Sequence, residues 1–303
     1  MRNSVKYLAV ALLFVILVAE IGLRFAGLGD PPIVELDKEI EYFPKPNSEF
    51  HRFGNLIKTN RYGMRSEDHD LSDASQHFVV IGDSVVYGNH FLDQGDTIPY
   101  QLAAQVTDYK VSSVAASSWG PGNIKAFIDR HQPIRGEVAF LVQSSHDRVD
   151  IPFTSPYLIP YRRTESYGAI HDVLTEIYER GKRAALKEKL RTVAYEEAIK
   201  ETELDLVAAI DTLKAEFDEV FLVYHPSMPE LGRVTNAEKY YKTLASKQQI
   251  GFINHRLVYE LYPAPAELYK DNIHLSAAGA AYFAESLKVY MQGGKSNSGP
   301  TAK

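Results

Sequence analysis

Short apolar runs rich in β-branched residues alternate with helix-favouring segments through the middle and end of this chain. The first run, residues 78–82 (FVVIG), is wholly apolar and ends in glycine, which is typical of a parallel strand buried on both faces. We expect further strands at 109–115, 137–143, 220–224 and 250–254, helices at 97–105 and 123–131, and a final helix capped by Ser276. This alternation predicts a parallel α/β sheet with helices on both faces.

The composition excludes several classes of protein. The 303 residues include 33 Lys+Arg and 39 Asp+Glu, so the formal charge is −6 and nothing indicates the basic face of a nucleic-acid-binding protein. The hydrophobic fraction of 45% and the charged fraction of 24% are those of an ordinary folded protein. The cysteine count is zero, which excludes disulfide frameworks, thiol nucleophiles and cysteine metal sites.

The sequence contains no strong motif for a metal site or a cofactor site. His90, His225 and His255 are scattered, without the spacing of a metal-ligand set, and we expect them to have packing or surface roles. Gly120-Pro121-Gly122 lacks the third glycine of a dinucleotide-binding loop. We therefore expect neither a metal nor an organic cofactor.

An unbroken apolar run at residues 7–19 continues to residue 29 with only Glu20 and Arg24 as charges. About 20 apolar residues are enough to cross a ~30 Å hydrocarbon core, so residues 1–29 are predicted to be a transmembrane anchor. Arg2 and Lys6 precede the run and acidic residues dominate the segment after it, which predicts a cytoplasmic N-terminus and a body on the periplasmic or extracytoplasmic side. A cleaved signal peptide and a buried core helix are the alternatives, although no clear A-x-A cleavage site is present after the run.

The rest of the chain divides into three parts. Residues 30–75 are polar and contain four prolines, and they suit a stalk or covering segment with a short strand near 53–59. The main domain spans 76–292 and contains a long helix-favouring insertion at about 160–217, which is a lid, a partner surface or a cover for the sheet. Residues 293–303 are predicted to be a flexible tail.

Basic and aromatic residues are interleaved within the covering segment. Such a mixture is expected either in a binding patch for an anionic partner or in an arm that packs its aromatic rings on a neighbouring sheet. The residues are His51, Arg52, Lys58, Arg61 and Arg65, with Phe50, Phe53 and Tyr62 between them.

Two short motifs at opposite ends of the main domain suggest serine chemistry. Gly82-Asp83-Ser84 follows the first strand, and working groups in open α/β sheets lie just beyond the carboxyl ends of strands. A serine hydroxyl needs a base, and that base needs an acid to fix its tautomer. Asp271 and His274, three residues apart before the final helix, can form such a pair. Each motif alone also fits a capping serine or an ordinary turn, but together they predict a triad of Ser84, His274 and Asp271.

With these motifs, the sequence resembles the SGNH (GDSL-type) hydrolase family. The strand followed by G-D-S is similar to the family's first block and D-N-I-H-L-S at 271–276 to its last, over a match from about 78 to 291. Asn60-x-x-Gly63-x-Arg65 is similar to an element that often precedes the domain in membrane-anchored members. The resemblance implies a flavodoxin-like three-layer α/β/α fold and ester-cleaving or acyl-transferring activity.

The middle blocks depart from the family pattern at the oxyanion hole. The resemblance implies backbone N–H donors from Ser84 and from a position that falls on Ser118 here, with Gly120 as the alternative. The family's asparagine amide donor is replaced by His146, whose ring N–H is a candidate donor. Loss of one such donor costs on the order of 10²–10³ in rate, so the resemblance leaves the level of activity open.

We therefore expect a membrane-anchored, exported serine esterase or O-acyltransferase. Its substrate would be an acylated, most plausibly acetylated, carbohydrate or a small ester, with Trp119 either stacking on a sugar or simply packing. The alternative is a catalytically impaired SGNH-fold subunit that binds or assembles with partners in a polysaccharide-modifying system. A soluble lipase-like enzyme is disfavoured by the anchor and by the absence of an extended apolar loop.

Overall fold

The structure, a computed structural model, describes residues 2–152, 159–189 and 195–293. Its centre is a five-stranded, wholly parallel sheet in the order β6-β5-β7-β8-β9. Counted along the chain this order is 2-1-3-4-5, which is that of flavodoxin-like folds. The strands are β5 (His77–Gly82), β6 (Lys110–Ala115), β7 (Gly136–Ser144), β8 (Phe217–His225) and β9 (Gly251–Asn254). The predicted parallel α/β architecture is confirmed.

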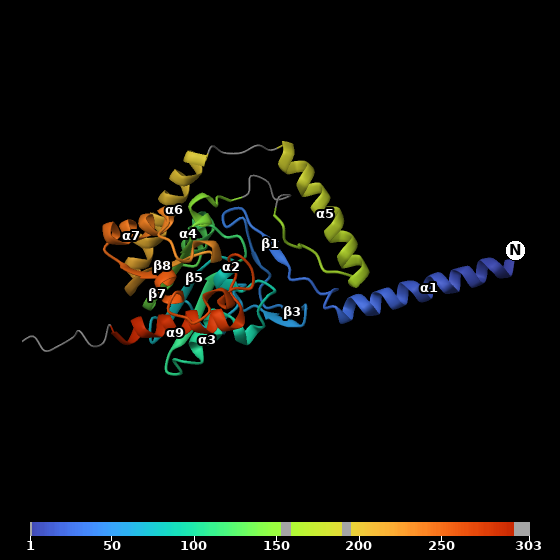
Figure 1. Ribbon diagram of the computed structural model, residues 1–303, viewed down its shortest axis with the longest axis horizontal. Helices are drawn as coiled ribbons and strands as arrows, with labels where there is room; N and C mark the ends of the chain where they lie inside the picture. Colours follow the sequence, from blue (N-terminus) through green and yellow to red (C-terminus); the bar gives the residue numbers. More distant parts are fainter. Residues whose placement is uncertain (1, 153–158, 190–194, 294–303) are drawn as a thin grey trace, which may run out of the picture.

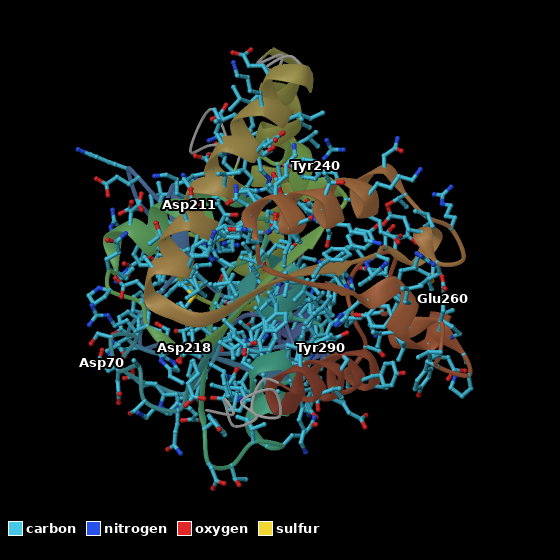
Figure 2. All side chains as sticks on the ribbon, turned by 90° about the vertical axis from the view of Figure 1, so that its left-hand side faces the viewer. Asp70, Asp211, Asp218, Tyr240, Glu260 and Tyr290 are labelled. Atoms are coloured by element: carbon cyan, nitrogen blue, oxygen red, sulfur yellow. The ribbon has the colours of Figure 1, made fainter. Side chains whose placement is uncertain are left out.

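Helices cover both faces of this sheet and give three layers (Figure 1). One face packs against α4 (Pro121–Arg130), α6 (Tyr195–Glu216) and α7 (Asn236–Gln248). The other packs against α2 (Ser84–Tyr87), α3 (Ile98–Ala103), α8 (His255–Tyr259) and α9 (Ala277–Gly293). Figure 2 shows side chains filling the interior, with exposed charged residues such as Asp70 and Glu260 at the periphery. The described residues also include short 3-10 turns at Gln94–Asp96, His146–Val149, Met228–Glu230 and Pro265–Leu268.

The central strand β5 explains why the two apolar layers form. All six of its residues are buried. Because side chains alternate along a strand, Val79 and Ile81 enter one core while Phe78 and Val80 enter the other. Gly82 closes the strand at a tight point, where a Cβ would lie 2.7 Å from a Val86 methyl carbon. The sequence of this strand therefore explains why it is buried on both faces of the sheet and why the chain turns tightly after Gly82 toward Ser84.

The covering segment contains two small hairpins. β1 (Val34–Leu36) pairs with β2 (Tyr42–Pro44), and β3 (Glu49–Arg52) pairs with β4 (Asn55–Lys58). The single strand expected near 53–59 is wrong at its start, because Phe53 and Gly54 adopt positive φ and form the turn of the second hairpin. Ile40, Tyr42 and Ile57 are fully buried, so the segment belongs to the folded body.

The basic residues of this segment are largely engaged within the protein. Arg65 is fully buried, Arg52 pairs with Asp172, and Arg61 pairs with Asp68. This arrangement favours the packing arm over the anionic-partner patch. Trp119 is also fully buried, with its indole N–H donating to the Tyr42 carbonyl, so the hypothesis of a sugar-stacking Trp119 is wrong.

The N-terminal helix α1 (Arg2–Phe25) projects away from the body (Figure 1). Its residues Ser4–Phe25 have a mean hydropathy of 2.4 and are long and apolar enough to cross a membrane, or to serve as a signal anchor. Near its end the Glu20 carboxylate accepts hydrogen bonds from the backbone N–H groups of Ala169 and Ile170. These groups begin α5 (Ala169–Lys189), so α1 caps the helix that opens the predicted insertion.

The insertion contains two helices, α5 and α6, as expected, and the predicted tail at 294–303 lies outside the described residues.

Candidate active site

The structure brings Ser84, His274 and Asp271 into one hydrogen-bonded chain. Ser84 Oγ lies 3.0 Å from His274 Nε2, although the two residues are 190 positions apart. His274 Nδ1 lies 2.8 Å from Asp271 Oδ2. This is the order in which a carboxylate orients an imidazole and the imidazole accepts a hydroxyl proton. The site lies where β5 and β7 end, the point at which the strand order of the sheet reverses.

Local structure presents the Ser84 hydroxyl at the start of a very short helix. Asp83 caps α2 by accepting a hydrogen bond of 2.8 Å from the Val85 N–H. The helix ends after one turn at Gly88, whose φ of 76° suits glycine. Ser84 is 8% exposed, so its hydroxyl is largely protected but accessible from one side.

A tight turn carries the Asp–His pair. Asp271 Oδ1 accepts from the backbone N–H groups of Ile273 and His274. Burial alone would raise the pKa of Asp271, but these N–H groups and the imidazole outweigh it and lower the pKa, which keeps the carboxylate charged. The turn is anchored to the end of β8, because His225 Nε2 donates to the Ile273 carbonyl at 2.8 Å. Burial lowers the pKa of His225 to about 4, so this histidine is neutral and can hold that bond.

Of the two candidate backbone donors after β6, the geometry favours Ser118. The Gly120 N–H already donates to Asn123 Oδ1 at 3.0 Å as part of the α4 cap. Ser118 has a φ of 57°, in the left-handed region that favours glycine. Its hydroxyl bonds to the Tyr161 hydroxyl at 2.7 Å, which helps to hold that conformation.

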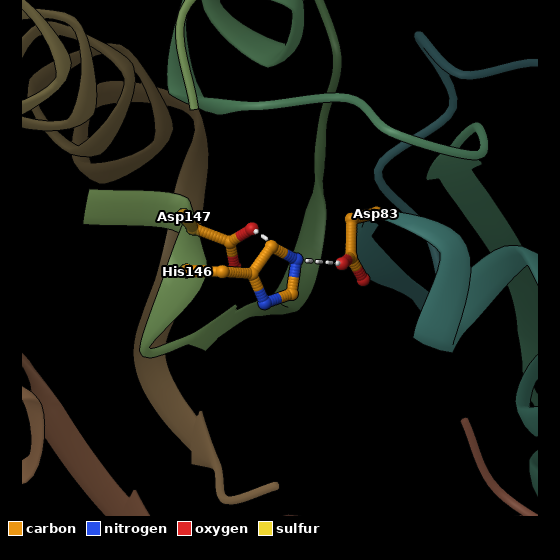
Figure 3. Close-up of side chains that lie close together, drawn as sticks. All are labelled: Asp83, His146 and Asp147. Carbon is orange, nitrogen blue, oxygen red and sulfur yellow. Dashed lines mark hydrogen bonds and ion pairs between the residues drawn. The ribbon is translucent and has the colours of Figure 1, made fainter. Parts of the chain in front are cut away.

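His146 lies in an ion-pair cluster (Figure 3). Its Nε2 lies 3.1 Å from Asp83 Oδ2 and 3.2 Å from Asp147 Oδ1. The negative charge of Asp147 is the largest cause that raises the pKa of His146, to about 10, so the ring is an imidazolium at neutral pH. Burial would raise the pKa of Asp83, but the His146 hydrogen bond and charge lower it. The ring nitrogen that sequence analysis expected as an oxyanion donor is thus shared by two carboxylates.

The same three side chains offer ligand atoms within 4.8 Å of one another, close enough to hold a metal ion. The contacts are equally those of a partly exposed cation between two buried acids, and Nε2 must carry a proton to make them. The ion pair therefore accounts for the cluster by itself.

The melting temperature of the full-length chain in detergent is expected to fall as the pH rises from about 6.5 to about 9. The pKa of His146 is about 10 in the folded protein, above its unfolded value of about 6.5, so its stabilising charge is complete below pH ~6.5 and is lost as the pH rises toward 10. The double variant His146→Gln/Asp147→Asn should give a flatter profile; an unchanged slope would contradict this origin.

Sequence reasoning missed Asn89. Its amide Nδ2 lies 3.0 Å from His274 Nε2, and its Oδ1 accepts a hydrogen bond from the Ser117 hydroxyl. Asn89 follows α2 directly and has a φ of 46°, a conformation in which asparagine is enriched. The G-N step at 88–89 was the available signal, since it indicates a sharp turn close to Ser84.

No protein-family model and no curated protein matches the chain. Solved structures do. A lipolytic protein of the G-D-S-L family from Veillonella parvula matches at 12% identity, over 71% of this chain and 98% of that one, with a TM-score of 0.46. TesA matches at 14% identity over 71% and 98%, with a TM-score of 0.45. An acetylxylan esterase from Geobacillus stearothermophilus matches at 14% over 71% and 93%, with a TM-score of 0.41. These are likenesses of fold.

Proposed function

We propose that this chain is a serine esterase or O-acyltransferase. The observation that carries the proposal is the hydrogen-bonded order Ser84–His274–Asp271, with heavy-atom distances of 3.0 and 2.8 Å. Distances of about 2.6–3.2 Å are those required between a nucleophile and its base. The lowered pKa of Asp271 supports the same roles, because a charged carboxylate stabilises the imidazolium that forms during the reaction.

In the proposed mechanism, His274 Nε2 takes the proton of Ser84 as Oγ attacks the ester carbonyl carbon. The backbone N–H groups of Ser84 and Ser118 donate to the oxyanion that develops. The C–O bond to the alcohol then breaks, and the proton on Nε2 passes to the departing oxygen. Water or an acceptor hydroxyl next gives its proton to Nε2 and attacks the acyl carbon. The bond between that carbon and Ser84 Oγ then breaks, and the proton on Nε2 returns to Oγ. Water completes a hydrolysis and another alcohol completes a transfer.

The proposed substrate is an acyl ester, such as an acetyl ester, of a carbohydrate outside the cytoplasm. The apolar α1, with Arg2 and Lys6 before it and acidic residues after it, supports a single-pass anchor with a cytoplasmic N-terminus and an extracytoplasmic domain. The carbohydrate is inferred from the resemblance to membrane-anchored SGNH proteins and from the extracytoplasmic placement of the domain.

Labelling with a fluorophosphonate probe tests the serine chemistry. We expect the full-length chain in detergent to be labelled and to hydrolyse p-nitrophenyl acetate, and Ser84→Ala to do neither. Ser227→Ala is the control, because Ser227 is also a serine at the start of a short helical turn, as its N-cap, but lies outside the triad. Equal labelling of wild type and Ser84→Ala would end the proposal.

The competing function is a non-catalytic binding or assembly subunit of a polysaccharide-modifying system. One observation favours it: His146 replaces the expected amide donor, and its Nε2 is engaged by two carboxylates. A chain that binds an oligosaccharide but neither labels nor turns over esters would have this function.

A further inference from the structure

A cavity of about 790 Å³ lies between α5 and the covering segment. Its size is within the range of small-molecule sites, which is roughly 300–1,000 Å³, and its walls are mainly apolar and aromatic with a few polar groups, as such sites usually are. Phe53, Tyr87 and Tyr161 supply aromatic rings, and Arg52, Asn89 and Ser117 supply polar groups.

Asn89 connects this cavity to the candidate triad. Asn89 lines the cavity, and its Nδ2 lies 3.0 Å from His274 Nε2, the same nitrogen that is 3.0 Å from Ser84 Oγ. A series of neighbouring aromatic rings also runs from Phe53 on the cavity wall to His274. The ring centroids of Phe53 and His90 are 5.2 Å apart, those of His90 and Phe91 4.5 Å, and those of Phe91 and His274 5.0 Å.

The proton transfers of His274 Nε2 identify which portion of an ester would lie on the Asn89 side of the triad. Besides Ser84 Oγ, the oxygens that exchange a proton with Nε2 are those of the departing alcohol and of the incoming water or acceptor alcohol. A group that also lies within hydrogen-bond distance of Nε2 is therefore placed to donate to that oxygen. Asn89 is such a group, because its amide has two N–H donors.

We propose that the cavity binds the alcohol portion of the ester, a group of ring size or larger, and that the Asn89 amide donates a hydrogen bond to the alcohol oxygen. This assignment rests on the proposed serine chemistry, and it adds which portion of the ester the cavity binds. As the Ser84–acyl bond forms, the acyl–oxygen bond of the alcohol breaks, and the proton on Nε2 passes to that oxygen. In a transfer, the acceptor alcohol binds in the same cavity, and the steps run in reverse: its proton passes to Nε2 as its oxygen attacks the acyl carbon.

The surroundings of Asn89 hold its amide in one orientation. Its Oδ1 accepts from the Ser117 hydroxyl, which leaves the Nδ2 group toward His274. Its backbone carbonyl accepts a hydrogen bond of 2.6 Å from Arg65 Nη1. Both contacts come from buried side chains. An amide held in this way loses little freedom when the alcohol oxygen arrives.

The assignment of the alcohol portion to the cavity is tested by filling the cavity. Gly181 on α5 lines it, and a Cβ there meets nothing within 4 Å, so the Gly181→Phe side chain starts in open space, adds bulk at the cavity and replaces a helix-weakening glycine. We expect Gly181→Phe to lower kcat/KM at least about tenfold for 1-naphthyl acetate and 4-methylumbelliferyl acetate. The values for ethyl acetate and for ethyl octanoate, which is bulky only on the acyl side, should change less than about threefold. Lys182→Phe is the matched control, because Lys182 is an exposed residue of the same helix that points about 100° away from Gly181 and does not line the cavity.

Selective loss on ethyl octanoate would place the acyl chain in the cavity and overturn the assignment, as would equal loss on all esters. Wild-type chain that neither labels nor hydrolyses any ester would instead overturn the proposed serine chemistry, and the assignment with it.

The role of Asn89 has a separate readout. Asn89→Gly keeps the positive φ and removes the amide. We expect its kcat/KM for ethyl acetate to fall about 10–100-fold, because a hydrogen bond to a charged oxygen is lost. The loss for p-nitrophenyl acetate should be smaller, because its leaving group needs little help, and the rate of fluorophosphonate labelling should stay within about threefold of wild type. Equal losses in all three measurements would reduce Asn89 to a structural role.

Discussion

Replacing His274 by alanine is expected to lower kcat for p-nitrophenyl acetate by about 10⁴–10⁶-fold, with little change in KM. Without the imidazole, Ser84 has no base to take its proton, and a serine hydroxyl is a weak nucleophile at neutral pH. The side chain is 19% exposed, so its removal leaves no large cavity in the core. Steady-state hydrolysis by the full-length chain in detergent measures the effect.

His51→Ala is the control for this experiment, because His51 is exposed and is remote in its contacts from Ser84. We expect it to keep wild-type kcat. If His274→Ala retained more than about a tenth of the wild-type rate while Ser84→Ala was inactive, another base would be activating Ser84 and the assigned triad would be wrong.

The second large effect is on stability, at Arg65. This side chain is fully buried, and each of its five N–H groups has an acceptor. Four acceptors are the backbone carbonyls of Leu56, Tyr87, Asn89 and Leu92, and the fifth is Gln94 Oε1. Arg65→Met is expected to lower the free energy of unfolding by roughly 3–5 kcal/mol, because it leaves these buried acceptors without donors.

At about 2–4 °C per kcal/mol, that loss lowers the melting temperature by roughly 6–20 °C. Thermal unfolding of the full-length chain in detergent measures it. Arg61→Met is the control, because Arg61 is half-exposed and its contacts are with exposed Asp68 and the neighbouring Tyr62 ring. A melting temperature within about 2 °C of wild type for Arg65→Met would show that the acceptors find other donors.

The periodic features of the fold could be predicted from the sequence. The apolar run at 78–82 identifies β5, and the alternation after it identifies the parallel sheet, because these patterns depend only on which faces are buried. Ser84, Asp271 and His274 could be nominated because serine chemistry restricts the residue types that can act together. Their spatial meeting needed the structure, since it depends on how β5 and the turn after η5 (Pro265–Leu268) are brought to one edge.

The features that sequence reasoning missed depend on contacts between distant segments. Arg65 belongs to a recognisable motif, and Asn60 Oδ1 accepts from the Tyr62 and Met64 N–H groups in the turn before it. Nothing in the motif itself says that the guanidinium is buried against the loop that carries Asn89. His146 was expected to replace an amide donor because of its position within the family's third block, whereas its protonation depends on two carboxylates, one of them 63 positions away.

The bond between Glu20 and the first N–H groups of α5 has a mechanical consequence. One wall of the large cavity is α5, and its starting turn is fastened to the helix that would lie in the bilayer. A fragment that begins after α1 keeps every triad side chain but lacks this cap, and the start of α5 is then held by the contacts of Asp172 with Gly29, Arg52 and Arg162. The segment predicted to anchor the protein therefore also caps the helix that forms one wall of the proposed alcohol-binding cavity.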